Sequence, residues 1–108
     1  MTRLFPTPEL EPAAFAARAG TVAAVLKRLA NPHRLMIACK LVEHGEMTVG
    51  DLAAAVGLSQ SALSQHLAKL REERLVAFRR ERQTLWYRIA DPRVEALLAA
   101  LYQLYCKD

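Results

Sequence analysis

Short hydrogen-bonding side chains are concentrated in one stretch of this chain, residues 57–67. A helix over this stretch keeps Leu63 and Leu67 on one side, so the serine, glutamine and histidine side chains occupy the opposite side. These side chains offer donors and acceptors without bulk, as contact with base edges in the DNA major groove requires. The candidate base-contacting residues are Ser59, Gln60, Ser61, Ser64, Gln65 and His66.

The excess positive charge of the chain lies beside this polar stretch. Residues 59–90 hold seven Lys and Arg against three Asp and Glu, which accounts for the whole net charge of +4. Clustered basic side chains neutralise DNA phosphates and supply the sequence-independent part of DNA affinity. For any single arginine here, a solvated charged surface is the alternative. The candidate phosphate-contacting residues include Lys69, Arg79, Arg80 and Arg82.

The chain has two cysteines, Cys39 and Cys106. From residue type alone, a free cysteine in a cytosolic protein is most often a small buried apolar residue. His33 and His44 are weak candidates for a shared metal site, because one lies at a helix start and the other in a polar loop. A thiol enzyme is not expected, since there is no Cys-x-x-Cys run, no βαβ pattern and no convincing catalytic base.

The periodicity of apolar residues predicts the elements that position these side chains. Helices are expected over 13–29, 32–43, about 48–56 and 59–74, and a last helix begins at Asp91. Two short strands are expected within 75–89, joined near Arg82 and Gln83. This order predicts a mainly α winged helix-turn-helix with five helices and a two-stranded wing. A winged helix that only binds proteins is the alternative, and it would leave the basic cluster unexplained.

Length and composition predict one domain, over residues 13–108. Residues 1–12 contain three prolines and no steady period, which indicates a flexible N-terminal arm. No stretch reaches the ~18 consecutive apolar residues of a membrane span, and the N-terminus lacks the order of a signal peptide. We therefore expect a soluble, cytoplasmic protein with no membrane partner.

Three segments carry a resemblance to a known family: LANPHRL at 29–35, LSQSALSQHL at 58–67 and QTLWYR at 83–88. Over roughly residues 13–107 the chain resembles the ArsR/SmtB family of bacterial repressors. The resemblance implies a homodimer, built largely from the first and last helices, that leaves double-stranded operator DNA when an inducer binds. By matching position, the polar residues from Ser59 to His66 fall on the recognition helix. The wing then carries Arg79, Arg80, Arg82 and Gln83.

The two familiar metal sites of that family are absent from this sequence. Thr48 and Gly50 stand where many members have the thiolates of a Cys-Val-Cys run. Along the last helix Asp91 is retained, but the other matching positions are unsuited to a divalent cation: Arg93, Leu104 and Lys107. No metal cofactor is expected.

The placement of Cys39 in the second helix and Cys106 at the chain end is similar to the dithiol branch of the family, the SqrR, BigR and HlyU type. This resemblance implies a sensor of persulfides or polysulfides, whose two thiols become linked within one subunit and thereby weaken operator binding. A metal, a peroxide or haem acting through the same cysteines is the alternative inducer.

Three details remain as expectations. A resting distance too wide for a disulfide would admit a polysulfide bridge and disfavour peroxide. Lys40 and Arg34 are candidates to lower the pKa of Cys39. His66 either contacts DNA or packs against the wing strands.

Overall fold

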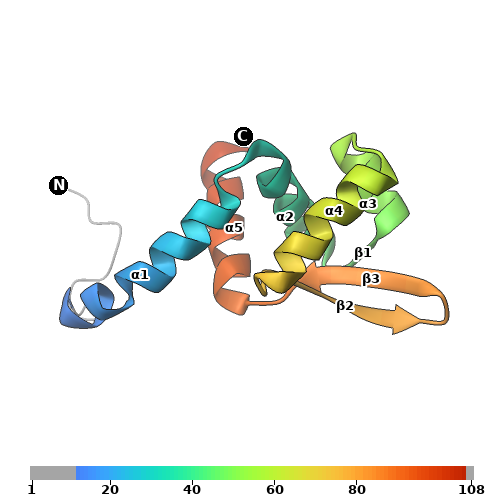
Figure 1. The fold of residues 1–108 in the computed structure, drawn as a ribbon. Coiled ribbons are helices and arrows are strands. Elements are labelled where there is room, and N and C mark those ends of the chain that lie inside the picture. The colour runs from blue at the N-terminus through green and yellow to red at the C-terminus, as the bar shows by residue number, and fades with distance from the viewer. Residues whose placement is uncertain (1–11, 107–108) are drawn as a thin grey trace.

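The computed structural model describes residues 12–106 (Figure 1). The predicted arm over 1–12 lies outside the described residues, apart from Pro12, which begins the first helix. In chain order the elements are α1 (Pro12–Leu29), α2 (Pro32–His44), β1 (Met47–Thr48), α3 (Val49–Val56), α4 (Gln60–Glu72), β2 (Val76–Glu81), β3 (Thr84–Ile89) and α5 (Pro92–Tyr105). The five predicted helices and the wing are confirmed.

Four of the helices begin at a capping side chain. Asn31, Thr48, Ser59 and Asp91 each accept a hydrogen bond from a backbone N–H in the first turn of α2, α3, α4 and α5. Such caps contribute about 1 kcal/mol each. Gly57 ends α3 with a φ of 71°, a left-handed conformation that glycine adopts without steric cost. This tight turn brings α4 directly after α3.

The β2–β3 hairpin is the predicted two-stranded wing, and a short strand that the sequence did not predict, β1, extends it to a three-stranded sheet in the order β1-β3-β2. The missed strand is β1, in which Met47 pairs with Tyr87 and Thr48 with Trp86. A strand of two residues has no alternation to detect, and only the tertiary fold brings it beside β3. The β2–β3 pair forms the projecting hairpin, joined at the predicted residues.

One apolar core holds the helices and the base of the sheet together. Its fully buried large side chains come from α2, α3, α4 and α5: Ile37, Leu41, Leu52, Leu63, Leu67, Leu70 and Leu98. Figure 1 shows α1 extending away from this core at one end and the β2–β3 hairpin projecting at the other. The α2 helix packs on both α3 and α5, so it connects these two helices. Among residues 12–106, no helix combines the length and the apolar character needed to cross a membrane.

Candidate nucleic-acid interface and thiol pocket

The face of α4 turned away from the core is polar and exposed. The helix packs on the core through Leu63, Leu67 and Leu70, which are at most 1% exposed. The predicted base-contacting residues Ser59, Gln60, Ser61, Ser64 and Gln65 are all exposed. Their short side chains therefore face solvent on one surface of a helix that buried leucines hold in place.

His66 differs from its polar neighbours, because it is half-buried. Its ring lies 5.8 Å from the ring of His33, at the start of α2. Burial lowers the pKa of His66, and the nearby His33 and Arg34 lower it further. The sequence left two roles open for His66, contact with DNA and packing against the wing strands, and the ring contact found here is with His33 on α2.

The tip of the wing presents exposed polar and basic side chains. Arg80, Arg82 and Gln83 are all exposed, and no ion pair within residues 12–106 involves either arginine. Arg82 adopts a φ of 60° at the first position of the two-residue turn. That left-handed conformation costs a non-glycine residue about 1–2 kcal/mol. Arg82 therefore places a guanidinium group at the tip of the wing in spite of its backbone strain.

Arg79 has a different role from its neighbours on the wing. Its guanidinium makes ion pairs with Glu46 at 2.9 Å and with Glu81 at 2.8 Å, and lies 5.5 Å over the ring of Trp86. The hydrogen bonds from Arg79 lower the pKa of Glu46. Arg79 thus ties the hairpin to the residue just before β1, and its charge is largely neutralised. Sequence reasoning missed this pair, because Glu46 lies far from Arg79 in the chain.

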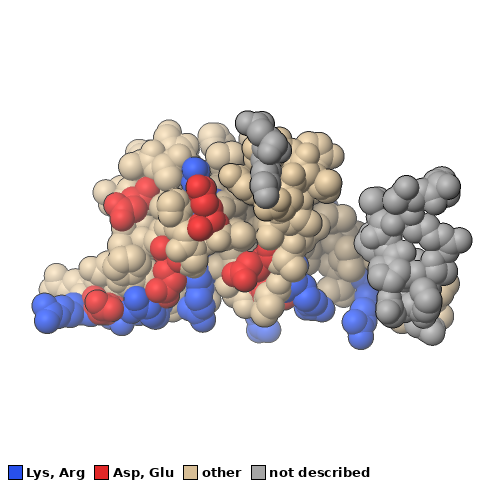
Figure 2. Space-filling model, turned by 180° about the vertical axis from the view of Figure 1, so that it is seen from behind, with Lys and Arg blue, Asp and Glu red and all other residues tan. Residues whose placement is uncertain are grey.

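Further basic side chains accompany α4 and the wing. Lys69 is exposed in the last turns of α4, and Arg71 lies 4.9 Å over the ring of Phe78, which couples α4 to β2. Figure 2 shows that Lys and Arg gather along one edge of the molecule, beginning at the projecting tip of the wing, whereas the upper part of this face carries few of them. On this face the basic side chains are therefore concentrated along the edge that begins at the wing.

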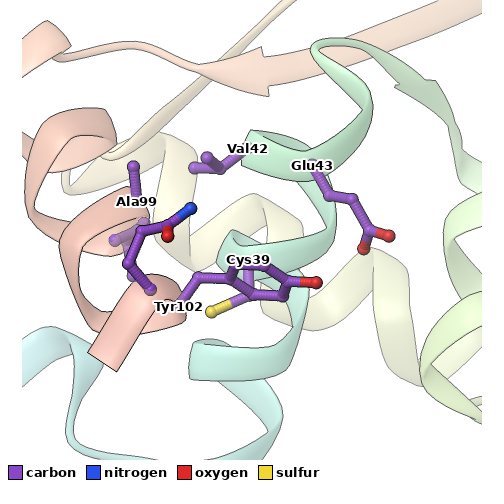
Figure 3. Close-up of a pocket in the computed structure, with 7 residues that line it drawn as sticks. Cys39, Val42, Glu43, Ala99 and Tyr102 are labelled. Carbon is purple, nitrogen blue, oxygen red and sulfur yellow. The ribbon is translucent and has the colours of Figure 1, made fainter. Parts of the chain in front are cut away.

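The thiol of Cys39 lies in a cavity of about 140 Å³ between α2 and α5. Most of the lining is apolar, from Val42 on α2 and from Leu98, Ala99 and Tyr102 on α5. Figure 3 shows Ala99 and Tyr102 reaching from α5 toward Cys39 and Val42 on α2, whereas the carboxylate of Glu43 extends to the side of α2 away from Ala99. Cys39 is half-buried and packs against the core.

Cys106 is the C-terminal cap of α5 and is exposed. Its backbone N–H donates a hydrogen bond to the carbonyl of Tyr102, one of the residues that line the cavity. Both cysteines are free thiols. The fold therefore places the two predicted sensor residues on the two helices that form the cavity.

The pKa of Cys39 is raised, chiefly because burial disfavours the charged thiolate. Negative charge on Cys106 and on Glu43 raises the pKa further, while Lys40 lowers it by a smaller amount. Charge on Cys106 acts on Cys39 because α2 and α5 are in contact. The expected effect of Lys40 is present but is outweighed by burial and by Glu43, whereas Arg34 pairs with Glu73 and is not among the groups that shift the pKa of Cys39.

Two contacts connect α2, which carries Cys39, to the polar-faced helix α4. Arg34 makes an ion pair with Glu73, the C-terminal cap of α4, at 3.1 Å, and also donates to the carbonyl of Arg28. The second contact is the one between His33 and His66. Both lie near the start of α2, so a tilt of α2 would move them. Within the described part of the chain, no three His, Cys, Asp or Glu side chains gather to hold a metal ion.

Comparison with known proteins gives a consistent result. The family described as bacterial regulatory proteins of the arsR family matches residues 31–77. The transcriptional activator HlyU of Vibrio cholerae is 47% identical over 83 residues, which cover 77% of this chain and 76% of that protein. The biofilm growth-associated repressor of Agrobacterium fabrum is 46% identical over 89 residues, which cover 82% of this chain and 75% of that protein.

A solved structure extends this similarity to the fold. The transcriptional repressor BigR of Xylella fastidiosa is similar to this chain with a TM-score of 0.82 at 39% identity, covering 92% of this chain and 100% of that one. The family match runs from Asn31, before α2, into β2, and the structural match covers a larger share of the chain.

Proposed function

Because the chain belongs to the ArsR family of bacterial transcriptional regulators, which are not enzymes, we propose that it is a repressor that binds operator DNA as a homodimer and releases it when reactive sulfur species link Cys39 to Cys106. One observation carries the sensing part of this proposal: Cys39 lies in a cavity between α2 and α5, and α5 ends at Cys106. The cytoplasm, where thiols are kept reduced, is the matching compartment.

Operator recognition is assigned to the exposed face of α4 and to the wing. Ser59, Gln60, Ser61, Ser64 and Gln65 contact base edges in the major groove, and Lys69, Arg80, Arg82 and Gln83 contact phosphates. Arg79 positions the wing through Glu46. His66 supports α4 from beneath through His33.

Unpartnered apolar side chains on α1 and α5 support a homodimer. Phe15 and Leu26 on α1 are 58% and 50% exposed, and Leu104 and Tyr105 near the end of α5 are 74% and 82% exposed. Such a concentration of exposed large apolar residues is typical of an interaction surface. A second copy would cover these residues and set the spacing of the two α4 helices, which must match half-sites about 34 Å apart.

The proposed chemistry uses persulfides both as sulfur donors and as oxidants. The Cys39 thiolate attacks the outer sulfur of R–S–S–H, the S–S bond breaks, and RS⁻ leaves, so that Cys39 becomes a persulfide. Repetition extends the sulfur chain, and the second thiol captures it with release of H₂S. For a four-sulfur bridge, two thiols and three R–S–S–H give the bridge, one H₂S and three R–S–H, which balances sulfur and hydrogen.

A bridge between α2 and α5 would act on DNA binding through α2. Closing the bridge pulls the two helices together at the cavity, and α2 is connected to α4 by the Arg34–Glu73 ion pair and the His33–His66 contact. A changed position of α4 in each subunit would misalign the pair of recognition helices. A coupling of about 1–3 kcal/mol would lower operator affinity about 5- to 150-fold.

Mass spectrometry of the intact protein tests the chemistry. After treatment with an organic persulfide, the wild-type chain should gain two sulfur atoms and lose two hydrogens, with no species at the mass of a covalently linked dimer. The variants Cys39→Ser and Cys106→Ser should form no such bridge. Peroxide, haem or a metal salt in place of the persulfide should not give this product. An unmodified chain, or the same adduct in both serine variants, would contradict the proposal.

A further inference from the structure

The cavity beside Cys39 differs chemically from the solvent around Cys106. Resting on the proposed sulfur-sensing role, we propose that this cavity selects small, electrically neutral sulfur donors, such as dialkyl polysulfides and the protonated form of alkyl hydropersulfides, over donors that carry carboxylate or sulfonate groups. Cys39 would then be the thiol that selects and attacks the donor, and Cys106 the thiol that closes the bridge.

The walls of the cavity favour apolar groups. Val42, Leu98 and Ala99 contribute aliphatic surface, and Tyr102 contributes an aromatic ring beside Cys39 (Figure 3). An alkyl group bound there leaves water at a gain of roughly 25 cal/mol per Å² of apolar surface. A carboxylate or sulfonate would lose hydration, and among the lining residues only neutral donors such as the Gln103 amide could offset that loss, which is unfavourable for a charged group. The cavity volume, about 140 Å³, suits a short alkyl chain with two or three sulfur atoms.

The charges at the cavity also oppose an anion. Among residues 12–106, the one charged residue that lines it is Glu43, and neither Lys nor Arg does so. The nearest basic side chain of the same helix, Lys40, is paired with the Glu43 carboxylate at 3.2 Å. Glu43 raises the pKa of Cys39 more than Lys40 lowers it, so the charges near the sulfur disfavour a second negative charge. A site built for an anionic donor would be expected to present an unpaired basic side chain instead.

A set of thiol reagents with one reactive group and different charges tests the selection. With a methanethiosulfonate, the thiolate attacks the sulfenyl sulfur, forms Cys–S–S–R and displaces methanesulfinate. The neutral ethyl reagent and the anionic sulfonatoethyl reagent differ only in R. Because both react with the same thiolate, the ratio of their rates at one pH does not depend on the pKa of the cysteine.

The two single-cysteine variants provide an internal control. Cys106→Ser leaves the thiol in the cavity, and Cys39→Ser leaves the exposed thiol at the end of α5. We expect the ratio of neutral to anionic rates to be about tenfold higher at Cys39 than at Cys106, the size of effect that one nearby charge and an apolar wall produce. Equal ratios at the two thiols would overturn the proposal.

Glu43→Gln sharpens the test by removing the negative charge at nearly constant shape. It should lower the ratio at Cys39 severalfold, whereas Glu72→Gln, an equal charge change on α4, should leave the ratio as it was. A ratio that stays high in Glu43→Gln assigns the selection to the apolar walls and supports the proposal. This experiment uses neither persulfide nor DNA, so its failure is distinguishable from failure of sulfur sensing itself.

Discussion

The side of the molecule that carries α4 and the wing and the side that carries the two thiols are stabilised in different ways. The wing and α4 are fixed by the Arg79–Glu46 ion pair, by Arg71 over Phe78 and by three buried leucines. The last turns of α5, by contrast, expose their large apolar side chains and end at an exposed thiol. This difference fits the proposed function, in which α4 and the wing form a preformed DNA-contacting surface and the packing of the end of α5 changes with a partner and with chemistry at Cys106.

The largest expected effect is on the free energy of unfolding, and it distinguishes the buried face of α4 from its exposed face. Leu67→Ala should lower the free energy of unfolding by about 2–5 kcal/mol, because the side chain is buried in the core. Ser64→Ala, on the exposed face of the same helix, should change it by less than about 0.5 kcal/mol and yet weaken operator binding. Urea unfolding and fluorescence anisotropy measure the two quantities. Similar losses of stability in both variants would remove the distinction between the faces.

Arg82→Gly should separate DNA binding from stability at the wing tip. Glycine relieves a backbone strain of about 1–2 kcal/mol but gives the unfolded chain about 0.5–1 kcal/mol more conformational freedom. The free energy of unfolding should therefore stay within about 1 kcal/mol of the wild-type value. Operator affinity should fall, and the slope of log affinity against log salt should decrease by about one. An unchanged salt slope would show that the tip does not reach a phosphate.

Neighbouring arginines on β2 should differ in the same measurement. Arg80→Ala should reduce the salt slope by about one, since the side chain is exposed and has no ion pair. Arg79→Ala should leave the slope nearly unchanged, because the guanidinium is already neutralised by Glu46 and Glu81. If the two variants lose equal slope, Arg79 contacts phosphate and the assigned positioning role is wrong.

The smallest expected effect is on the pH dependence of the alkylation rate of Cys39. Because the pKa of Cys39 is raised, its thiolate fraction at neutral pH should be lower than that of an ordinary thiol, and its alkylation rate should keep rising at higher pH. Iodoacetamide alkylation of Cys106→Ser, compared with a cysteine-containing peptide, measures the shift. Glu43→Gln should move the midpoint down and Lys40→Ala should move it up. A midpoint below that of the peptide would contradict the burial of Cys39.

The features predicted from the sequence are those with local causes. Asn31, Thr48, Ser59 and Asp91 act as helix caps within their own first turn, so the starts of α2 to α5 could be located from residue type alone. The polar face of α4 follows from helical spacing in the same way. The exposed serines and glutamines and the arginines of the wing are therefore where the sequence predicts them.

The features that were missed depend on residues distant in the chain. The strand β1 exists because Met47 and Thr48 meet β3, and Arg79 is neutralised because the fold brings Glu46 to it. The contact of His66 with His33 arises in the same way. The direction of the Cys39 pKa shift follows from burial between α2 and α5, which no local pattern encodes.

Operator affinity before and after persulfide treatment, at matched salt and with the product identified by mass, tests the central claim most directly. We predict a fall of about 5- to 150-fold in the wild-type protein. Reduction with a thiol should reverse this fall, and Cys106→Ser should not show it. Equal affinity of the bridged and reduced proteins would contradict the coupling of the thiol pair to DNA binding.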